Sequence, residues 1–424
     1  MMDTAVEVSR RFSRVHPKKK PCGDADGETR RRSPTVDPVS KVLGDDNLLG
    51  EILLRVGFPT TLVCAALVCR CWYQLASDRG FLRRFRELHP PRLLGFYIDS
   101  GLVWPESMAV PRFVPMLPQP PELAAVVRRM ASHNFSTREV PWIMDSRNDS
   151  IFTRHRERRE LACGVYRPLC PERGIDDVPP LPSTQDRSRL NFGAILSKEE
   201  GNGLSYFYVL TEGTDETEKF TMRVYMLQGS VWCLHTLATY QLHLPLPRAI
   251  VVLVDNKIYM AASPAGDIIV LDLTASSLSR IQLPPGVKYH SFNTVLSRAD
   301  DPSGIYLIHV NGFKLHIWLH TGDNWLLVDT ICLHEMCANL RMLDSTLEDE
   351  HTSRCYICQA GDNAEFLFLK MCGCVLYLDV KNRTLRKVHA MAQKDLHLTA
   401  VYPFMMVWPP TFPALKDGPA RNVM

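Results

Sequence analysis

The stretch that decides how this chain is organised runs from Leu43 to Phe85, and its first part reads Leu43-Gly44-Asp45-Asp46-Asn47-Leu48-Leu49-Gly50-Glu51-Ile52-Leu53-Leu54-Arg55-Val56. Apolar residues recur in it at steps of three and four, which predicts a helix with one apolar stripe. The members of that stripe are Leu48, Leu49, Ile52, Leu53 and Val56. We expect Asp45 or Asp46 to cap the helix, and Gly57 with Pro59 to end it.

Two further helices are predicted after this turn. Thr60 or Thr61 can cap the second helix, which is expected to turn Leu62, Val63, Ala66 and Leu67 inward. The third helix carries Val68, Trp72 and Leu75. A unit of this size cannot bury all of these apolar groups within itself. The helices therefore form either one end of a larger core or a helical plug for the groove of a partner.

The residues from Leu43 to Phe85 resemble the F-box. The resemblance rests on the acidic pair before the first helix, on the proline-containing turn, on Leu67-Val68-Cys69-Arg70-Cys71-Trp72, and on the ending Phe81-Leu82-Arg83-Arg84-Phe85, which looks like that of plant members. Gly44 stands where the family has proline, and the connection from Gly57 to Ala66 is about one residue longer than the family pattern, a change that loops tolerate.

This resemblance implies that residues 39–86 dock on a Skp-type adaptor protein. Trp72 and Leu75 would then lie in the core of the unit itself. The adaptor-binding residues that it implies are Leu43, Leu48, Leu49, Ile52, Leu53, Leu62, Val63, Leu67 and Val68.

The composition is that of a globular protein, with 46% hydrophobic residues among 424 and a net charge of +3. This near-neutral charge does not argue for any particular partner. The longest apolar runs, such as Ala249 to Val254, are far too short to span a bilayer, so no membrane is expected. The 13 cysteines are scattered, and Met1 to Ser40 lacks an apolar signal region. We therefore expect an intracellular protein with reduced thiols.

Residues 1–38 are polar and interrupted by prolines, which predicts a disordered basic segment. Its two basic clusters resemble a bipartite nuclear import signal; they are Lys18, Lys19, Lys20 and Arg30, Arg31, Arg32. The alternative is a charge run that is only a solvated tail. Direct nucleic-acid binding is not expected, because Phe12 is the only Phe, Tyr or Trp among the basic residues. The predicted localisation is accordingly the nucleus, the cytoplasm or both.

Short apolar strands dominate the rest of the chain. Residues 87–139 are predicted to be a proline-rich connection with one strand, at Leu93 to Ile98. Residues 140–414 then repeat in five units, each with about four strands and a period of roughly 40–60 residues, which is typical of propeller blades. One blade cannot bury both of its faces, so blades must stack around an axis. A β-sandwich stays open as the alternative, since neither a Trp-Asp nor a kelch double-glycine signature is present.

The predicted fold class is therefore α+β and multidomain: a small three-helix F-box, then an all-β, propeller-like domain of the kelch type or a related one, then a tail at 415–424. The plant F-box families with carboxy-terminal propeller-like domains look similar. Tyr402-Pro403-Phe404-Met405-Met406-Val407-Trp408 adds to this resemblance. We expect it to supply a last strand that closes the ring and pairs with Leu93 to Ile98.

The most prominent candidate for a metal site is Cys355-x-x-Cys358 with Cys372-Gly373-Cys374. Zinc sites use close cysteine pairs on tight turns. Cys355 and Cys358 instead lie in a strand-like run, which would point their sulfurs to opposite faces. Buried structural cysteines are therefore predicted here, and neither a metal nor a cofactor.

Motifs for nucleophilic catalysis or phosphate binding do not stand out in the sequence. Asp145, Asp272 and Asp379 recur with the repeat, which favours a turn-capping role over paired acid/base chemistry. We therefore expect no enzyme. Through the resemblance, the predicted function is that of a substrate adaptor in a Skp–cullin–F-box ubiquitin ligase, which would reach cullin and RING subunits through Skp and would bind an unidentified protein substrate. The alternatives are an F-box scaffold outside the ligase and a propeller-type enzyme.

Overall fold

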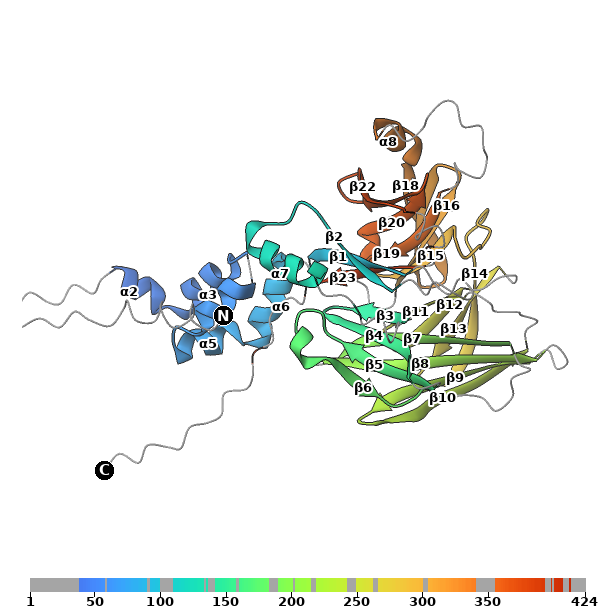
Figure 1. Cartoon of the computed structure of the whole chain (residues 1–424), viewed down its shortest axis with the longest axis horizontal. Helices are drawn as coiled ribbons and strands as arrows, with labels where there is room; N and C mark the ends of the chain where they lie inside the picture. Colours follow the sequence, from blue (N-terminus) through green and yellow to red (C-terminus); the bar gives the residue numbers. More distant parts are fainter. Residues whose placement is uncertain are drawn as a thin grey trace, which may run out of the picture.

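The computed structural model describes residues 38–57, 59–89, 92–99, 110–132, 135, 142–157, 160–182, 190–200, 203–214, 219–241, 249–261, 266–299, 304–340, 355–392, 398, 400–406 and 412. Within these residues the strands form six antiparallel sheets arranged around one axis, with a run of short helices extending to one side (Figure 1). This radial arrangement is a six-bladed β-propeller, and it excludes the β-sandwich.

Five blades each contain four strands that follow one another in the chain. Blade 1 contains β3 (Trp142–Arg147), β4 (Ser150–Glu157), β5 (Glu160–Tyr166) and β6 (Ile175–Val178). Blade 2 contains β7 (Leu190–Glu200), β8 (Gly203–Thr214), β9 (Lys219–Gln228) and β10 (Val231–Gln241). Blade 3 contains β11 (Ile250–Val254), β12 (Lys257–Ala261), β13 (Asp267–Asp272) and β14 (Ser277–Gln282).

Blade 4 contains β15 (Thr294–Arg298), β16 (Ile305–Asn311), β17 (Lys314–Thr321) and β18 (Asn324–Cys332), and helix α8 (Leu333–Asn339) follows it. Blade 5 contains β19 (Tyr356–Ala360), β20 (Phe366–Met371), β21 (Cys374–Asp379) and β22 (Thr384–Ala390). Short 3-10 turns lie at Pro171–Arg173 (η1) and Asp362–Ala364 (η2). These five blades coincide with the five units that the sequence repeats predict.

The sixth blade joins the two ends of the propeller. Its order is β2-β1-β23, from β1 (Leu93–Asp99), β2 (Arg112–Pro115) and the late strand β23 (Ala400–Met405). β1 pairs with β23 in an antiparallel register, with Tyr97 opposite Tyr402. The predicted pairing of these two segments is therefore confirmed. Such a closure leaves the ring without an open sheet edge between its first and last blades.

The connection predicted at 87–139 differs from the structure in two ways. It contains both β1 and β2, and its prolines are followed by helix α7 (Pro121–Ser132). Pro121 stands at the first helical position, where its missing N–H needs no partner, so this proline starts a helix rather than breaking one. The propeller accordingly begins before residue 140.

The helical segment at 38–88 forms five short helices rather than the three expected: α2 (Pro38–Leu43), α3 (Asp46–Leu54), α4 (Pro59–Ala66), α5 (Arg70–Ala76) and α6 (Arg79–Leu88). Asp45 caps α3 as predicted, because its carboxylate accepts hydrogen bonds from the backbone N–H of Asn47 at 2.9 Å and of Leu48 at 3.1 Å. The additional break between α5 and α6 is set by Asp78, whose carboxylate caps α6 at Phe81 N, 2.9 Å away.

One apolar cluster joins the helical segment to the propeller. It contains Leu53 and Phe85 from the helices, Val127 from α7, and Tyr97 and Phe404 from blade 6. The His89 ring also lies 2.6 Å, through Nε2, from the Leu54 carbonyl. Because helices and blades share a core, the helical segment is held in a defined position against the ring. None of the helices in the described ranges is long and apolar enough to span a membrane.

Candidate functional site

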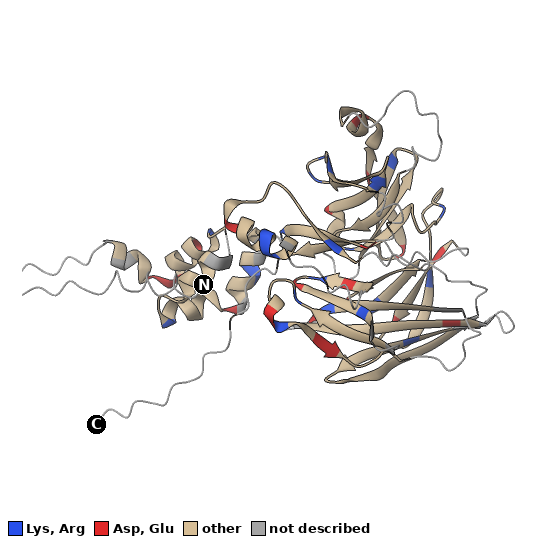
Figure 2. Cartoon of the chain, viewed as in Figure 1, with Lys and Arg blue, Asp and Glu red and all other residues tan. Residues whose placement is uncertain are grey.

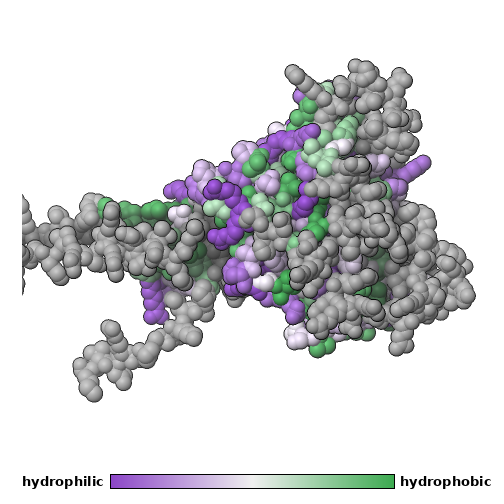
Figure 3. All heavy atoms as spheres, in the orientation of Figure 1, coloured by the Kyte–Doolittle hydropathy of each residue, from purple (hydrophilic) through white to green (hydrophobic). Residues whose placement is uncertain are grey.

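The helical segment presents an apolar surface formed by α2, α3 and the α4–α5 turn. Its exposed residues include Leu67 at 73%, Val68 at 64%, Leu48 at 48% and Ile52 at 42%. Leu43, Val39 and Val42 are exposed as well. Figure 3 shows hydrophobic surface along this segment, next to polar surface on the propeller. Exposed apolar surface of this kind is typical of a protein-interaction site.

Three residues expected on the adaptor-binding face lie elsewhere: Leu49, Leu53 and Leu62 are buried in the core shared with the propeller. Leu48 and Ile52 form one stripe of α3 at a spacing of four, while Leu49 and Leu53 form the adjacent stripe. Both stripes are apolar, so the spacing alone cannot show which one faces the core.

The other predicted residues of the helical unit are neither fully buried nor strongly exposed. Val63 is half-buried. Trp72 and Leu75, expected in the core of the unit, are half-buried and pack against the core cluster. The basic residues Lys18, Lys19, Lys20, Arg30, Arg31 and Arg32 and the predicted tail at 415–424 lie outside the described residues.

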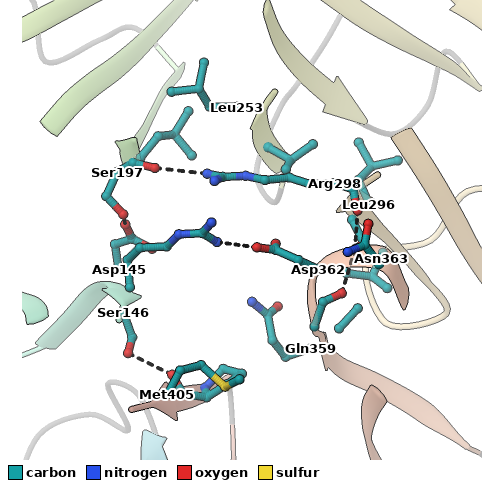
Figure 4. Close-up of a pocket in the computed structure, with 18 of the residues that line it drawn as sticks. Asp145, Ser146, Ser197, Leu253, Leu296, Arg298, Gln359, Asp362, Asn363 and Met405 are labelled. Carbon is teal, nitrogen blue, oxygen red and sulfur yellow. Dashed lines mark hydrogen bonds and ion pairs between the residues drawn. The ribbon is translucent and has the colours of Figure 1, made fainter. Parts of the chain in front are cut away.

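A second candidate site is a cavity of about 800 Å³ inside the propeller ring. Its wall includes residues from the innermost strand of every blade, β3, β7, β11, β15, β19 and β23. Arg83 of α6 also lines it, so the cavity reaches toward the helical segment. Charged and polar side chains concentrate inside it, as Figure 4 shows, whereas on the rest of the molecule both signs of charge are interspersed (Figure 2).

Two arginines link different blades across this cavity. Arg147 of blade 1 forms an ion pair with Asp362, between blade 5 strands, at 2.8 Å and lies 3.4 Å from Glu199 of blade 2. Arg298 of blade 4 donates to the backbone carbonyl of Ser197 in blade 2 at 3.0 Å. Both side chains therefore tie together segments of different blades that are far apart in the sequence.

The two guanidinium groups have different electrostatic surroundings. Burial by itself would lower the pKa of Arg147, but Asp362 and Glu199 raise it above its ordinary value. Burial lowers the pKa of Arg298, and the like charge of Arg147 lowers it further. Arg298 is therefore the less well compensated of the two charges.

Asp145 lies in this cavity and not in a turn, contrary to the role expected from its place in the repeat. Its carboxyl oxygen accepts a hydrogen bond from the Ser197 hydroxyl at 2.5 Å. Burial raises the pKa of Asp145, and the Ser197 bond and Arg147 oppose that shift. The other two aspartates do cap turns: Asp272 accepts from Thr274 N and Ala275 N, each at 2.9 Å, and Asp379 accepts from Asn382 N at 2.8 Å.

Sequence reasoning missed Arg147, Arg298 and Gln359 as members of a site. A weak signal for the first two was present. Three of the repeats have a serine followed by a basic residue at or near the end of their first strand: Ser146-Arg147, Ser197-Lys198 and Ser297-Arg298. Since equivalent positions of a propeller meet at its axis, this recurrence points to the channel.

The cysteines of the candidate metal site lie around blade 5. Cys355 and Cys374 are buried and belong to an apolar cluster that also includes Cys337 of α8. Burial raises the pKa of Cys355 to about 12, so its thiol stays protonated. Among the described residues no group of three or more His, Cys, Asp or Glu side chains could hold a metal ion.

The fold and these two sites define a class of protein: a six-bladed β-propeller that carries a helical segment with an exposed apolar surface. A family model described as "F-box protein AT5G49610-like, beta-propeller" matches residues 142–412, which is more than half of the chain. The chain therefore belongs to this plant F-box family.

Solved structures show a distant likeness. A protein from Lactobacillus plantarum has 10% identity and a TM-score of 0.36, over 71% of this chain and 83% of that chain. YCF48 from Cyanidioschyzon merolae has 9% identity and a TM-score of 0.37, over 70% of this chain and 86% of that chain. Likeness at these scores carries no argument about function. No curated protein matches the chain.

Proposed function

We propose that this chain is the substrate-recognition adaptor of a Skp–cullin–F-box ubiquitin ligase. The helical segment docks on a Skp-type adaptor, which connects it to the cullin and RING subunits, and the propeller binds a protein substrate. The observation that supports this most is the exposed apolar surface around Leu48, Ile52 and Leu67, on helices attached to the propeller of an F-box family. A groove-filling helical surface is a common mode of partner recognition.

The proposed role is non-catalytic. The chain holds a substrate near a charged conjugating enzyme and raises the effective concentration of the two reactants. The core shared by Leu53, Phe85 and Phe404 supports this role, because it prevents the helical segment from swinging freely against the propeller. A fixed spacing between the docking surface and the substrate is what such a carrier needs.

The test is reconstitution of the complex from purified subunits. The full chain should co-elute with a Skp-type adaptor and, when the cullin is added, with the cullin. Replacing Leu48 and Ile52 together with Arg should abolish co-elution, because two charges would enter an apolar interface. The matched control is Leu326→Arg on β18, where the side chain is also exposed, at 62%. Unchanged co-elution of the Leu48/Ile52 variant would refute the proposed docking surface. Binding to Skp without the cullin would instead favour a scaffold outside the ligase.

Nuclear import is part of the same proposal and rests on the two basic clusters in the sequence. Replacing Lys18, Lys19, Lys20, Arg30, Arg31 and Arg32 with Ser should shift a tagged protein toward the cytoplasm. Adaptor binding should stay the same, because the replaced residues precede the helical segment. An unchanged distribution between nucleus and cytoplasm would contradict this part of the proposal.

A further inference from the structure

Arg298 forms no ion pair with a carboxylate in the described part of the chain, although Asp145, Glu199 and Asp362 act on its charge from a longer distance. Its guanidinium makes a single hydrogen bond, to the Ser197 carbonyl, and no ion pair with any described residue. The Asp362 carboxylate instead forms an ion pair with the Arg147 guanidinium, with 2.8 Å between nitrogen and oxygen. The Arg298 side chain contributes no nitrogen to the set of fully buried atoms that lack a hydrogen-bond partner. The nitrogens that do not donate to Ser197 are therefore open to the cavity and available to a ligand.

Further unused donors line the same cavity. The side-chain amide of Gln359 on β19 makes no hydrogen bond to any described residue, and it is directed into the cavity, on the opposite side of the Asp362 ion pair from Arg298 (Figure 4). The Nε atom of Arg147 is buried without a partner. A buried N–H that gives up water without gaining a partner costs free energy. A bound ligand at this site would compensate for part of that cost.

We propose that the propeller channel binds a small monocarboxylic acid, whose carboxylate pairs with the Arg298 guanidinium and whose body extends toward the Gln359 amide. Guanidinium matches a carboxylate in planar, bidentate geometry. The cavity of about 800 Å³ lies within the range of ordinary small-molecule sites. This site is independent of the proposed role as a ligase adaptor, since none of the residues on the apolar helical surface takes part in it.

The acidic side chains in the cavity favour a monoanionic carboxylate ligand over a dianionic phosphate ligand. Glu199 and Asp362 lie beside Arg147, and Asp145 lies beside Ser197, so the cavity already holds three acidic side chains, all of which act on the charge of Arg298. A phosphate dianion would meet about twice the repulsion that a monoanion meets at the same distance. A monoanionic head group satisfies Arg298 at the lower electrostatic cost.

The carboxylate can come from a free small acid or from the carboxyl terminus of a peptide. The experiment is saturation-transfer NMR on the full-length chain, with probes that differ only in charge. The small-molecule probes are butyrate with butyramide and benzoate with benzamide. The peptide probes are acetyl-Gly-Gly-Ala as the free acid and as the amide. Inorganic phosphate is added as a competitor.

We expect the acids to bind and the corresponding amides to bind at least about tenfold more weakly, because a hydrogen bond to a charged group contributes more than a neutral one. Arg298→Gln should weaken acid binding by a similar factor. Gln359→Ala should weaken it less and leave the melting temperature unchanged, because this amide has no partner to lose. The charge control is Arg280→Gln on β14, which pairs with Asp267 outside the cavity and should have no effect.

The proposal is overturned if acids and amides bind equally, if phosphate displaces the acids at equal concentration, or if Arg298→Gln binds the acids as the parent does. Binding of butyrate or benzoate with no binding of the peptide acid identifies a free small molecule as the ligand. Binding of the peptide acid alone identifies a peptide terminus as the source of the carboxylate. If Arg298→Gln folds poorly, the proposed site is tested by Gln359→Ala instead. Weaker acid binding with an unchanged melting temperature then supports the site, and unchanged acid binding contradicts it.

Discussion

Truncation of Leu67 to alanine should weaken Skp-adaptor binding while the fold stays intact. Leu67 lies in the turn between α4 and α5 with 73% of its surface exposed, so it contributes little to the core. Complete burial of a leucine side chain contributes about 1.5–3 kcal/mol. Burial of the exposed part against the adaptor would therefore contribute about 1–2 kcal/mol. The Kd should rise about five- to thirtyfold in the variant.

Two matched leucine variants separate docking from folding. Leu326 on β18 is 62% exposed but lies on the outer strand of blade 4, so Leu326→Ala should leave the Kd unchanged. Leu62 is fully buried, so Leu62→Ala should destabilise the helical segment by about 2–5 kcal/mol. The assay is calorimetric titration of the adaptor into each variant, with circular dichroism melting of the same samples. If Leu67→Ala binds as tightly as the parent, or if Leu62→Ala melts as the parent does, the assignment of exposed and buried stripes is wrong.

Three further predictions concern the propeller. Phe404→Ala removes a fully buried ring at the closure of blade 6 and should cost about 3–5 kcal/mol of unfolding free energy in a urea titration; a loss below about 1 kcal/mol would mean that blade 6 does not lock the ring. Tyr402→Phe removes the hydroxyl that donates to the Ile143 carbonyl at 2.6 Å, and should cost about 1–2 kcal/mol in the same titration, with an unchanged far-UV spectrum. Because burial raises the pKa of Cys355 to about 12, N-ethylmaleimide at pH 8 should label it far more slowly than the exposed Cys64 in the native protein, as measured by peptide mass spectrometry; equal rates would contradict the burial of Cys355.

Much of the propeller could be predicted from local patterns in the sequence. The alternation of apolar strands and turn residues defined five blades, since strand period and turn chemistry depend on neighbours in the chain. The Asp272 and Asp379 turns follow the same logic, because each carboxylate accepts from a backbone N–H only two or three residues away. The cap at Asp45 was predictable for the same reason.

The helical segment shows where local patterns stop being sufficient. Leu48 and Leu49 are adjacent in the sequence and equally apolar, yet one is half exposed and the other fully buried. Only the packing of α3 against α6 and the propeller core determines which of the two leucines is buried. The extent of blade 6 also depends on pairing between the two ends of the propeller, which the chain alone indicated for β1 but not for β2.

The sequence by itself therefore determined the repeated strands, the turn and cap residues, and the F-box resemblance of Leu43 to Phe85. Only the tertiary structure decided which apolar stripe of α3 faces solvent and which side chains share the channel. Arg147 meets Asp362, and Arg298 meets Ser197, because ring closure brings the innermost strand of every blade to one axis. Contacts of this kind join positions far apart in the chain: the recurring serine-basic pair points Arg147 and Arg298 to the channel, but it does not show which residues they meet there.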